Sequence, residues 1–237
     1  MIRMKVAFVL RMVNDFSGRW IRDRGFRFSS DGRPVHPVEK EDGLYVFLEP
    51  QESQVRISID SAGYYPCSVL VEKKTLDPQE PILEVRLYEK AGKQYSQGTA
   101  YLTGKVDNIR QRPVEVYAKK SSATGLVFRE YRNLEGADWI WFSGFSKENL
   151  LGKTWLLDDE QNPLMFILQE KRGINEYRAE IIRGEPEKIR SGTSLCRIYR
   201  SVTDTQGAYA IPVESGEENR LLEVVPLLEN KNKKEGD

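Results

Sequence analysis

The chain has 237 residues, of which 39% are hydrophobic, 10% aromatic and 30% charged, and its 36 lysines and arginines balance 36 aspartates and glutamates. This length predicts one or two compact domains, and the composition excludes a disordered chain and a membrane-embedded one. Charge balance disfavours non-specific binding to nucleic acid. The single histidine, His36, excludes two-histidine zinc sites and disfavours most familiar hydrolases.

The N-terminal residues do not form a signal peptide of the usual kind, because Arg11 interrupts the apolar run from Val6 to Met12. No stretch reaches the ~18 apolar residues needed to cross a bilayer. We therefore expect no membrane span and a protein that is cytoplasmic at synthesis, whether it stays there or joins an assembled particle. Cys67 and Cys196 both lie on alternating patterns and are expected to be buried free thiols.

Strand patterns dominate the first ninety residues. Apolar and polar side chains alternate with period two in segments 55–59, 67–71 and 83–87, which is typical of half-buried antiparallel strands. Turn signals such as Asp31-Gly32 and Asp42-Gly43 separate the strands. The spacing predicts a β-sandwich over residues 1–92, with a domain boundary in the polar segment 91–98.

A second small β domain is expected over residues 99–228, because strand-like segments resume after the boundary. These segments are 114–118, 139–142, 155–157, 164–168, 177–182, 195–202, 208–213 and 221–227. Ser146 and Gly152 suit the two ends of one short helix over 147–151. Residues 229–237 contain no apolar side chain and are expected to be a disordered tail. The sequence thus predicts an all-β protein with at most one short helix.

Four motifs in the N-terminal part occur in a recognisable order: Phe16-Ser-Gly-Arg-Trp-Ile, Asp31-Gly-Arg-Pro, Asp42-Gly-Leu-Tyr-Val-Phe-Leu and Val55-Arg-Ile-Ser-Ile-Asp-Ser-Ala-Gly-Tyr. Their order resembles the carboxypeptidase regulatory-like, or prealbumin-like, antiparallel β-sandwich. The resemblance implies an accessory module that binds, spaces or assembles other proteins.

A second resemblance extends to the whole chain. Val9-Leu-Arg-Met-Val-Asn-Asp-Phe-Ser-Gly-Arg and Gly43-Leu-Tyr-Val-Phe-Leu are similar to segments in components of phage-tail-like contractile injection particles. This resemblance implies a structural role inside a multiprotein assembly.

Arginines gather near the N-terminus, interleaved with Trp20, Phe26 and Phe28: the candidates for partner binding are Arg19, Arg22, Arg24 and Arg27. Residues 1–33 contain eight basic and three acidic side chains, whereas residues 34–90 contain six basic and eleven acidic ones. This separation of charge favours a steered contact with an acidic protein over a nucleic-acid groove. Solvated arginines without a partner are the alternative interpretation.

Trp139-Ile-Trp-Phe142 is the densest aromatic run of the chain. Trp139 and Trp141 share one face of the predicted strand, and a strand buried on both faces is the simplest interpretation. If that face is exposed instead, the two indoles would anchor a partner protein or stack on sugars.

No catalytic, metal or cofactor site is predicted. His36 and Glu39 have a zinc-like spacing, but the chain offers no second histidine to complete a ligand set. Asp158, Asp159 and Glu160 are consecutive carboxylates, which favours a hairpin tip exposed to water over a calcium site.

These patterns predict a non-catalytic interaction protein that binds protein partners through strand edges and its basic N-terminal face, and the second resemblance implies that it is an assembly component of a contractile injection particle. The alternative hypothesis is a carbohydrate-binding or adhesive module with a tryptophan platform. Neither hypothesis includes nucleic acid as a ligand.

Overall fold

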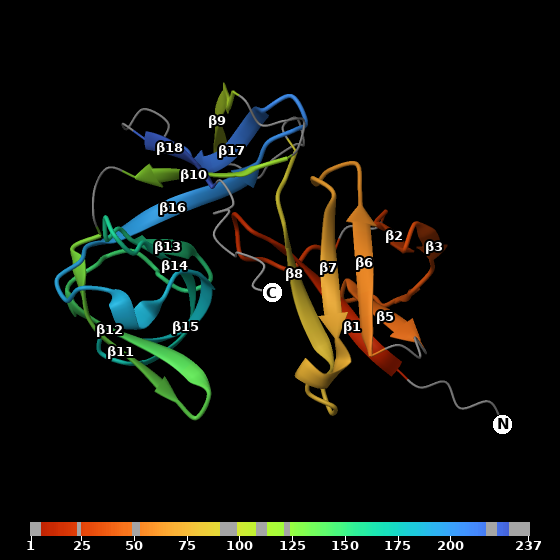
Figure 1. Ribbon diagram of the computed structural model, residues 1–237, viewed down its shortest axis with the longest axis horizontal. Coiled ribbons are helices and arrows are strands. Elements are labelled where there is room, and N and C mark those ends of the chain that lie inside the picture. The colour runs from red at the N-terminus through yellow and green to blue at the C-terminus, as the bar shows by residue number, and fades with distance from the viewer. Residues whose placement is uncertain are drawn as a thin grey trace, which may run out of the picture. The chain divides into compact units, whose positions relative to one another are not determined.

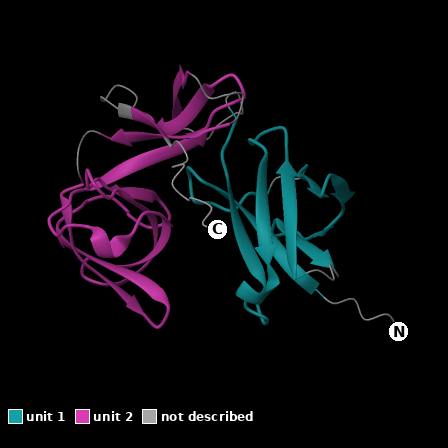
Figure 2. Cartoon of the chain, viewed as in Figure 1, with its two compact units in different colours: residues 1–94 teal, residues 95–237 magenta. Residues whose placement is uncertain are grey.

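The computed structural model describes residues 6–22, 25–48, 53–90, 99–107, 113–120, 124–216 and 222–227. The protein is all-β, as predicted: strands account for 61% and short helical turns for 3%, and the described ranges contain no helix of seven or more residues. No described helix is long and apolar enough to span a membrane. The chain divides into unit 1, residues 1–94, and unit 2, residues 95–237 (Figure 2). The expected boundary segment 91–98 and tail 229–237 lie outside the described residues.

Unit 1 is built from two four-stranded sheets (Figure 1). The first sheet has the order β4 (Val38–Glu39), β5 (Leu44–Leu48), β1 (Val6–Asn14), β8 (Ile82–Leu87). The second has the order β3 (Arg33–Val35), β2 (Arg27–Ser30), β6 (Gln54–Asp60), β7 (Cys67–Glu72), and the short turn η1 (Lys73–Thr75) follows β7. Neighbouring strands are antiparallel except β1 and β8, which are parallel.

The two sheets share one apolar core, which makes unit 1 a sandwich. Period-two alternation directs every second side chain of a strand inward. In β6 these side chains are Val55, Ile57 and Ile59, all buried as the alternation predicts. Phe8 of β1 stacks on Phe47 of β5, with ring centroids 4.6 Å apart.

Unit 2 contains an eight-stranded antiparallel sheet and a two-stranded one. The larger sheet has the order β11 (Leu126–Leu134), β12 (Ala137–Gly144), β15 (Glu176–Arg183), β14 (Leu164–Gly173), β13 (Thr154–Leu157), β16 (Leu195–Val202), β10 (Glu115–Lys120), β18 (Leu222–Leu227). The smaller sheet pairs β17 (Ala208–Glu214) with β9 (Thr99–Lys105). The turn η2 (Pro186–Lys188) lies between β15 and β16.

Part of the larger sheet closes into a barrel, visible as a ring of strands in Figure 1. The start of β11 bonds to the residues just before β16: the Phe128 amide donates to the Thr193 carbonyl at 2.8 Å, and the Gly192 amide donates to the Phe128 carbonyl at 2.8 Å. Val127 also forms a bridge with Ser194. Closure removes the exposed sheet edge along this seam. The barrel core contains, among others, Leu126, Ile140, Trp155, Leu157, Leu164, Phe166 and Leu168.

The predicted helix over 147–151 does not form; the segment is a loop. The Glu148 amide donates to the Ser146 hydroxyl at 3.1 Å, and the Leu151 amide donates to the Asn149 side-chain oxygen at 3.2 Å. Serine and asparagine side chains compete in this way for the backbone groups that a helix would use. The helix prediction was wrong because the side chains of Ser146 and Asn149 bind backbone amides within a loop.

Candidate functional site

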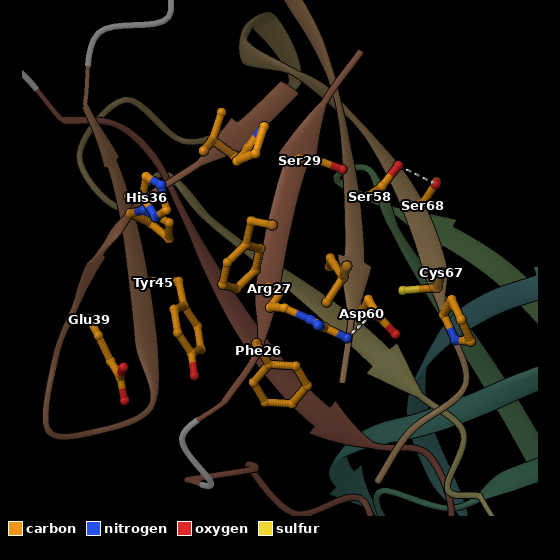
Figure 3. Close-up of a pocket in the computed structure, with 16 residues that line it drawn as sticks. Phe26, Arg27, Ser29, His36, Glu39, Tyr45, Ser58, Asp60, Cys67 and Ser68 are labelled. Atoms are coloured by element: carbon orange, nitrogen blue, oxygen red, sulfur yellow. Dashed lines mark hydrogen bonds and ion pairs between the residues drawn. The ribbon is translucent and has the colours of Figure 1, made fainter. Parts of the chain in front are cut away.

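Unit 1 contains a hollow of about 730 Å³, within the size range of small-molecule sites. Its walls come from β2, β6, the start of β7, β5 and the short connection between β3 and β4. Figure 3 shows His36, Glu39 and Tyr45 on one side of this hollow and Ser58, Ser68 and Cys67 on the other. Residues more than twenty positions apart in the sequence therefore meet around one space.

Aromatic rings form much of the wall. Phe28 and Tyr45 have ring centroids 4.8 Å apart, and Phe26 meets Tyr45 edge-on at 5.8 Å. Phe26 also contacts Tyr64 at 5.9 Å, which links the wall to the core. These rings come from β5 and from residues in and around β2, whose side chains the sandwich brings together from opposite sheets.

The polar side chains that line the hollow are Arg27, Ser29, His36, Glu39, Ser58, Asp60 and Ser68, and the charged Arg27 and Asp60 are paired with each other. The guanidinium of Arg27 is bound to the carboxylate of Asp60 at 2.5 Å. The hydroxyls of Ser58 and Ser68 share a hydrogen bond at 2.9 Å. Burial raises the pKa of the Cys67 thiol to about 11, so the thiolate nucleophile is scarce at neutral pH.

The zinc-like pair of the sequence, His36 and Glu39, has exposed side chains at the rim of the hollow. Within the described ranges no group of three or more His, Cys, Asp and Glu side chains is placed to hold a metal ion.

The predicted arginines do not form one cluster. Arg19 and Arg22 are exposed and flank Trp20 in the chain after β1, whereas Arg27 lies on β2 in the other sheet. Arg24 lies outside the described residues. Proximity in sequence overstated their proximity in space because the chain crosses from one sheet to the other between these residues.

A second surface, which the sequence analysis missed, lies on the outer side of the β4-β5-β1-β8 sheet. Val9 of β1 pairs with Val46 of β5 and with Ile82 of β8, and Val46 pairs in turn with Val38 of β4. These four side chains, here called the valine face, lie opposite the inward-pointing Phe8, Leu10, Tyr45 and Phe47. The near-continuous apolar run of β1 was the available signal, since a strand with one wet face alternates instead.

Trp20 lies beside the valine face. Its side chain is 49% exposed, and the guanidinium of Arg11 lies 4.3 Å from the centroid of its ring. Arg11 also bonds to Glu84 at 3.3 Å. The backbone of Trp20 forms a bridge with Val13 of β1, which places this residue at the edge of β1.

The two tryptophans of β12 differ in burial. Trp139 is only 8% exposed, with Arg172 over its ring at 5.4 Å. Trp141 is half-buried, with Arg132 over its ring at 5.5 Å. Ile140 on the opposite face is part of the barrel core. The indoles thus do not form an open pair of ring faces, and the fold favours packing over stacking on a flat ligand at this position.

The carboxylates after β13 are not all exposed, which corrects the prediction of a hairpin tip exposed to water. Asp159 is buried and accepts hydrogen bonds from Arg190 Nε at 2.9 Å and Nη2 at 3.1 Å, and from the Gln161 amide at 3.2 Å. The bonds from Arg190 hold the pKa of this carboxyl down to about 2. Asp158 remains at the surface in an ion pair with Lys119.

Comparison with protein-family models, with curated proteins and with solved structures finds no match to this chain.

Proposed function

We propose that this chain is a non-catalytic interaction protein that docks onto a protein partner through the valine face and the residues around Trp20. The observation that carries this proposal is the outer side of the β4-β5-β1-β8 sheet, where the four apolar side chains of the valine face lie next to the Arg11–Glu84 ion pair. A sheet with one face exposed to water normally has polar side chains on that face. An exposed apolar patch of this kind marks an interaction site.

Exposure on this face supports a role in binding. Val38 is 43% exposed, and Val46 and Ile82 are half-buried, so the row is accessible at three of its four positions. Trp20 is half-exposed beside this row, and its sequence neighbours Arg19 and Arg22 are exposed. Tryptophan and arginine dominate the binding energy of protein interfaces, because they combine large buried area with directional contacts.

Strand edges offer a second means of contact. β8 ends the first sheet and β7 ends the second, and each such edge can pair with a strand from another protein. β7 carries no charged side chain before Glu72, and its Leu70 is 44% exposed. Charged side chains that would discourage edge pairing are therefore absent from most of this strand.

The assembly that we propose is a phage-tail-like contractile injection particle, with unit 1 as a prealbumin-like docking module. The support for this finer proposal is the resemblance of residues 9–19 and 43–48 to components of such particles. Arg19 lies at the end of the first of these segments, beside Trp20 at the margin of the valine face.

Co-purification with the products of neighbouring genes tests the proposal. We expect the wild-type chain to elute with at least one of these proteins in size-exclusion chromatography. Val38→Asp combined with Val46→Asp should abolish this complex, because it places two unpaired charges in the contact. The matched control is Ile174→Asp, an exposed apolar residue of unit 2. A complex that survives the double substitution, or the absence of any complex, would overturn the proposal.

A further inference from the structure

The hollow of unit 1 differs from the valine face, because it is a concave space with side chains of both sheets in its wall. Concave, mostly apolar spaces of a few hundred Å³ with a few polar groups are where proteins bind small ligands. The hollow is therefore a candidate ligand site that is separate from the valine face.

The wall favours an aromatic ring. Phe26, Phe28 and Tyr45 already contact one another in tilted and edge-on arrangements, at centroid distances between 4.8 and 6.5 Å. An added ring can extend this series, and such ring pairs contribute beyond the area that they bury. The sulfur of Cys67 is a further wall atom that contacts ring edges favourably.

Charge favours a neutral ligand. The charged side chains of the hollow lie toward water: Arg27 and Asp60, which are 80% and 44% exposed, bind each other, and Glu39 is exposed at the rim. The hydroxyls of Ser29, Ser58 and Ser68 add uncharged donors and acceptors along the wall. A ring that carries one N–H or O–H group matches this combination of aromatic and hydroxyl surface.

From this geometry we infer that the hollow is a binding site for a neutral aromatic ring of the indole or phenol class. The ring can belong to a free small molecule or to the side chain of a peptide, and the two sources share the same chemistry. The inference does not depend on the valine face, since the two surfaces use different residues.

Protection of Cys67 from a thiol reagent tests the inference on the unmodified protein. Labelling by N-ethylmaleimide at about pH 9, where more thiolate forms, would be measured separately for Cys67 and Cys196 by peptide mass spectrometry. Indole at about ten times its dissociation constant should slow the labelling of Cys67 about tenfold. Cys196 lies in unit 2 and is the internal control.

Two comparisons sharpen this test. Cyclohexanol, a ring without π electrons, should leave the labelling rate of Cys67 unchanged at the same concentration. The peptide acetyl-Gly-Trp-Gly-amide, with acetyl-Gly-Leu-Gly-amide as its control without a ring, separates the two sources. Protection by the tryptophan peptide assigns the ring to a polypeptide ligand. Protection by indole alone assigns it to a small molecule. Equal protection by indole and cyclohexanol, or no protection by indole or by the tryptophan peptide, would overturn the inference.

A substitution in the wall gives an independent readout. Phe26→Leu removes one ring but keeps an apolar side chain, and it should weaken indole binding about two- to tenfold. Phe145→Leu removes an exposed ring of unit 2 and should leave the affinity unchanged. Unchanged affinity in Phe26→Leu would contradict the assignment of the ring wall. Loss of the partner complex in Val38→Asp, Val46→Asp with intact indole binding would separate this site from the docking surface.

Discussion

Most strand pairs are antiparallel both in unit 1 and in the barrel of unit 2, but the sheets of unit 1 have open edges and the barrel is closed. The barrel joins β11 to the residues before β16, so its strands pair around the ring. The sheets of unit 1 end in β3, β4, β7 and β8, and one of them carries the valine face on its outer side. A closed barrel satisfies its own backbone groups, whereas an open sheet leaves groups for a partner. We therefore expect unit 1 to make the partner contacts and the barrel to be self-contained.

The largest effect on stability is expected for Trp155→Ala in the barrel core, which tests whether the barrel is self-contained. Trp155 is fully buried, and its indole N–H donates to the Leu150 carbonyl at 2.8 Å. Its loss should lower the free energy of unfolding of unit 2 by about 3–5 kcal/mol. In hydrogen exchange, the amides of 164–168 should lose protection and those of 55–59 should keep it. Loss of protection in both segments would show that the barrel is not self-contained.

A smaller effect is expected at the two ends of the β11–β12 pair, where Gly136 lies in the connecting turn and Gly144 lies at the open end opposite Leu126. Gly144 and Gly136 both have positive φ angles, of 102° and 80°, but only at Gly144 would a Cβ atom collide with a backbone atom, the carbonyl oxygen of Gly125. Gly136→Ala should cost about 1 kcal/mol from the backbone conformation alone, and Gly144→Ala about 3 kcal/mol. Urea unfolding followed by tryptophan fluorescence measures both. Equal costs would mean that the backbone of Gly125 moves easily to make room for the added methyl group.

The Asp159–Arg190 pair makes the stability of unit 2 depend on pH. The pKa of the Asp159 carboxyl is about 2 in the folded protein and 3.8 when unperturbed, so its contribution is complete above about pH 4 and disappears as the pH falls through 2. Asp159→Asn should therefore unfold at a lower temperature than the wild type at neutral pH. The difference in melting temperature should shrink between pH 4 and pH 2. A difference that stays constant over this range would exclude the carboxylate charge as its cause.

The smallest effect is expected at the tip of the β14–β15 hairpin. Ile174 is 93% exposed, and the turn is fixed by its neighbour Asn175, which has a φ of 57° and donates from Nδ2 to the Gly144 carbonyl at 2.9 Å. Ile174→Ser should change the free energy of unfolding by less than about 0.5 kcal/mol. A larger loss in chemical denaturation would mean that this side chain packs within the protein.

Strand prediction from sequence worked best where alternation was regular. The expected segments 55–59, 67–71 and 83–87, in which apolar and polar side chains alternate, lie within β6, β7 and β8. The prediction omitted β11, whose pairing with β12 shifts register between Phe128 and Glu130. Such a bulge breaks the period of two, so the apolar side chains of β11 no longer alternate along the chain.

The candidate sites were harder to predict because they depend on which strands become neighbours. The aromatic wall joins Phe26 and Phe28 to Tyr45, nearly twenty residues away and in the opposite sheet. Asp159 resembles its neighbour Asp158 in sequence, but it is buried and bound by the exposed Arg190, thirty-one residues further on. No local pattern contains that information.

The sequence by itself determined that this protein is made of strands, because side-chain periodicity is a local property that each segment displays alone. Only the tertiary structure decided which strands form an open sandwich and which close into a barrel, and where a hollow and an apolar outer face remain. Those outcomes depend on pairing between distant segments, where burial and hydrogen bonding across strands, not local preference, select the partners.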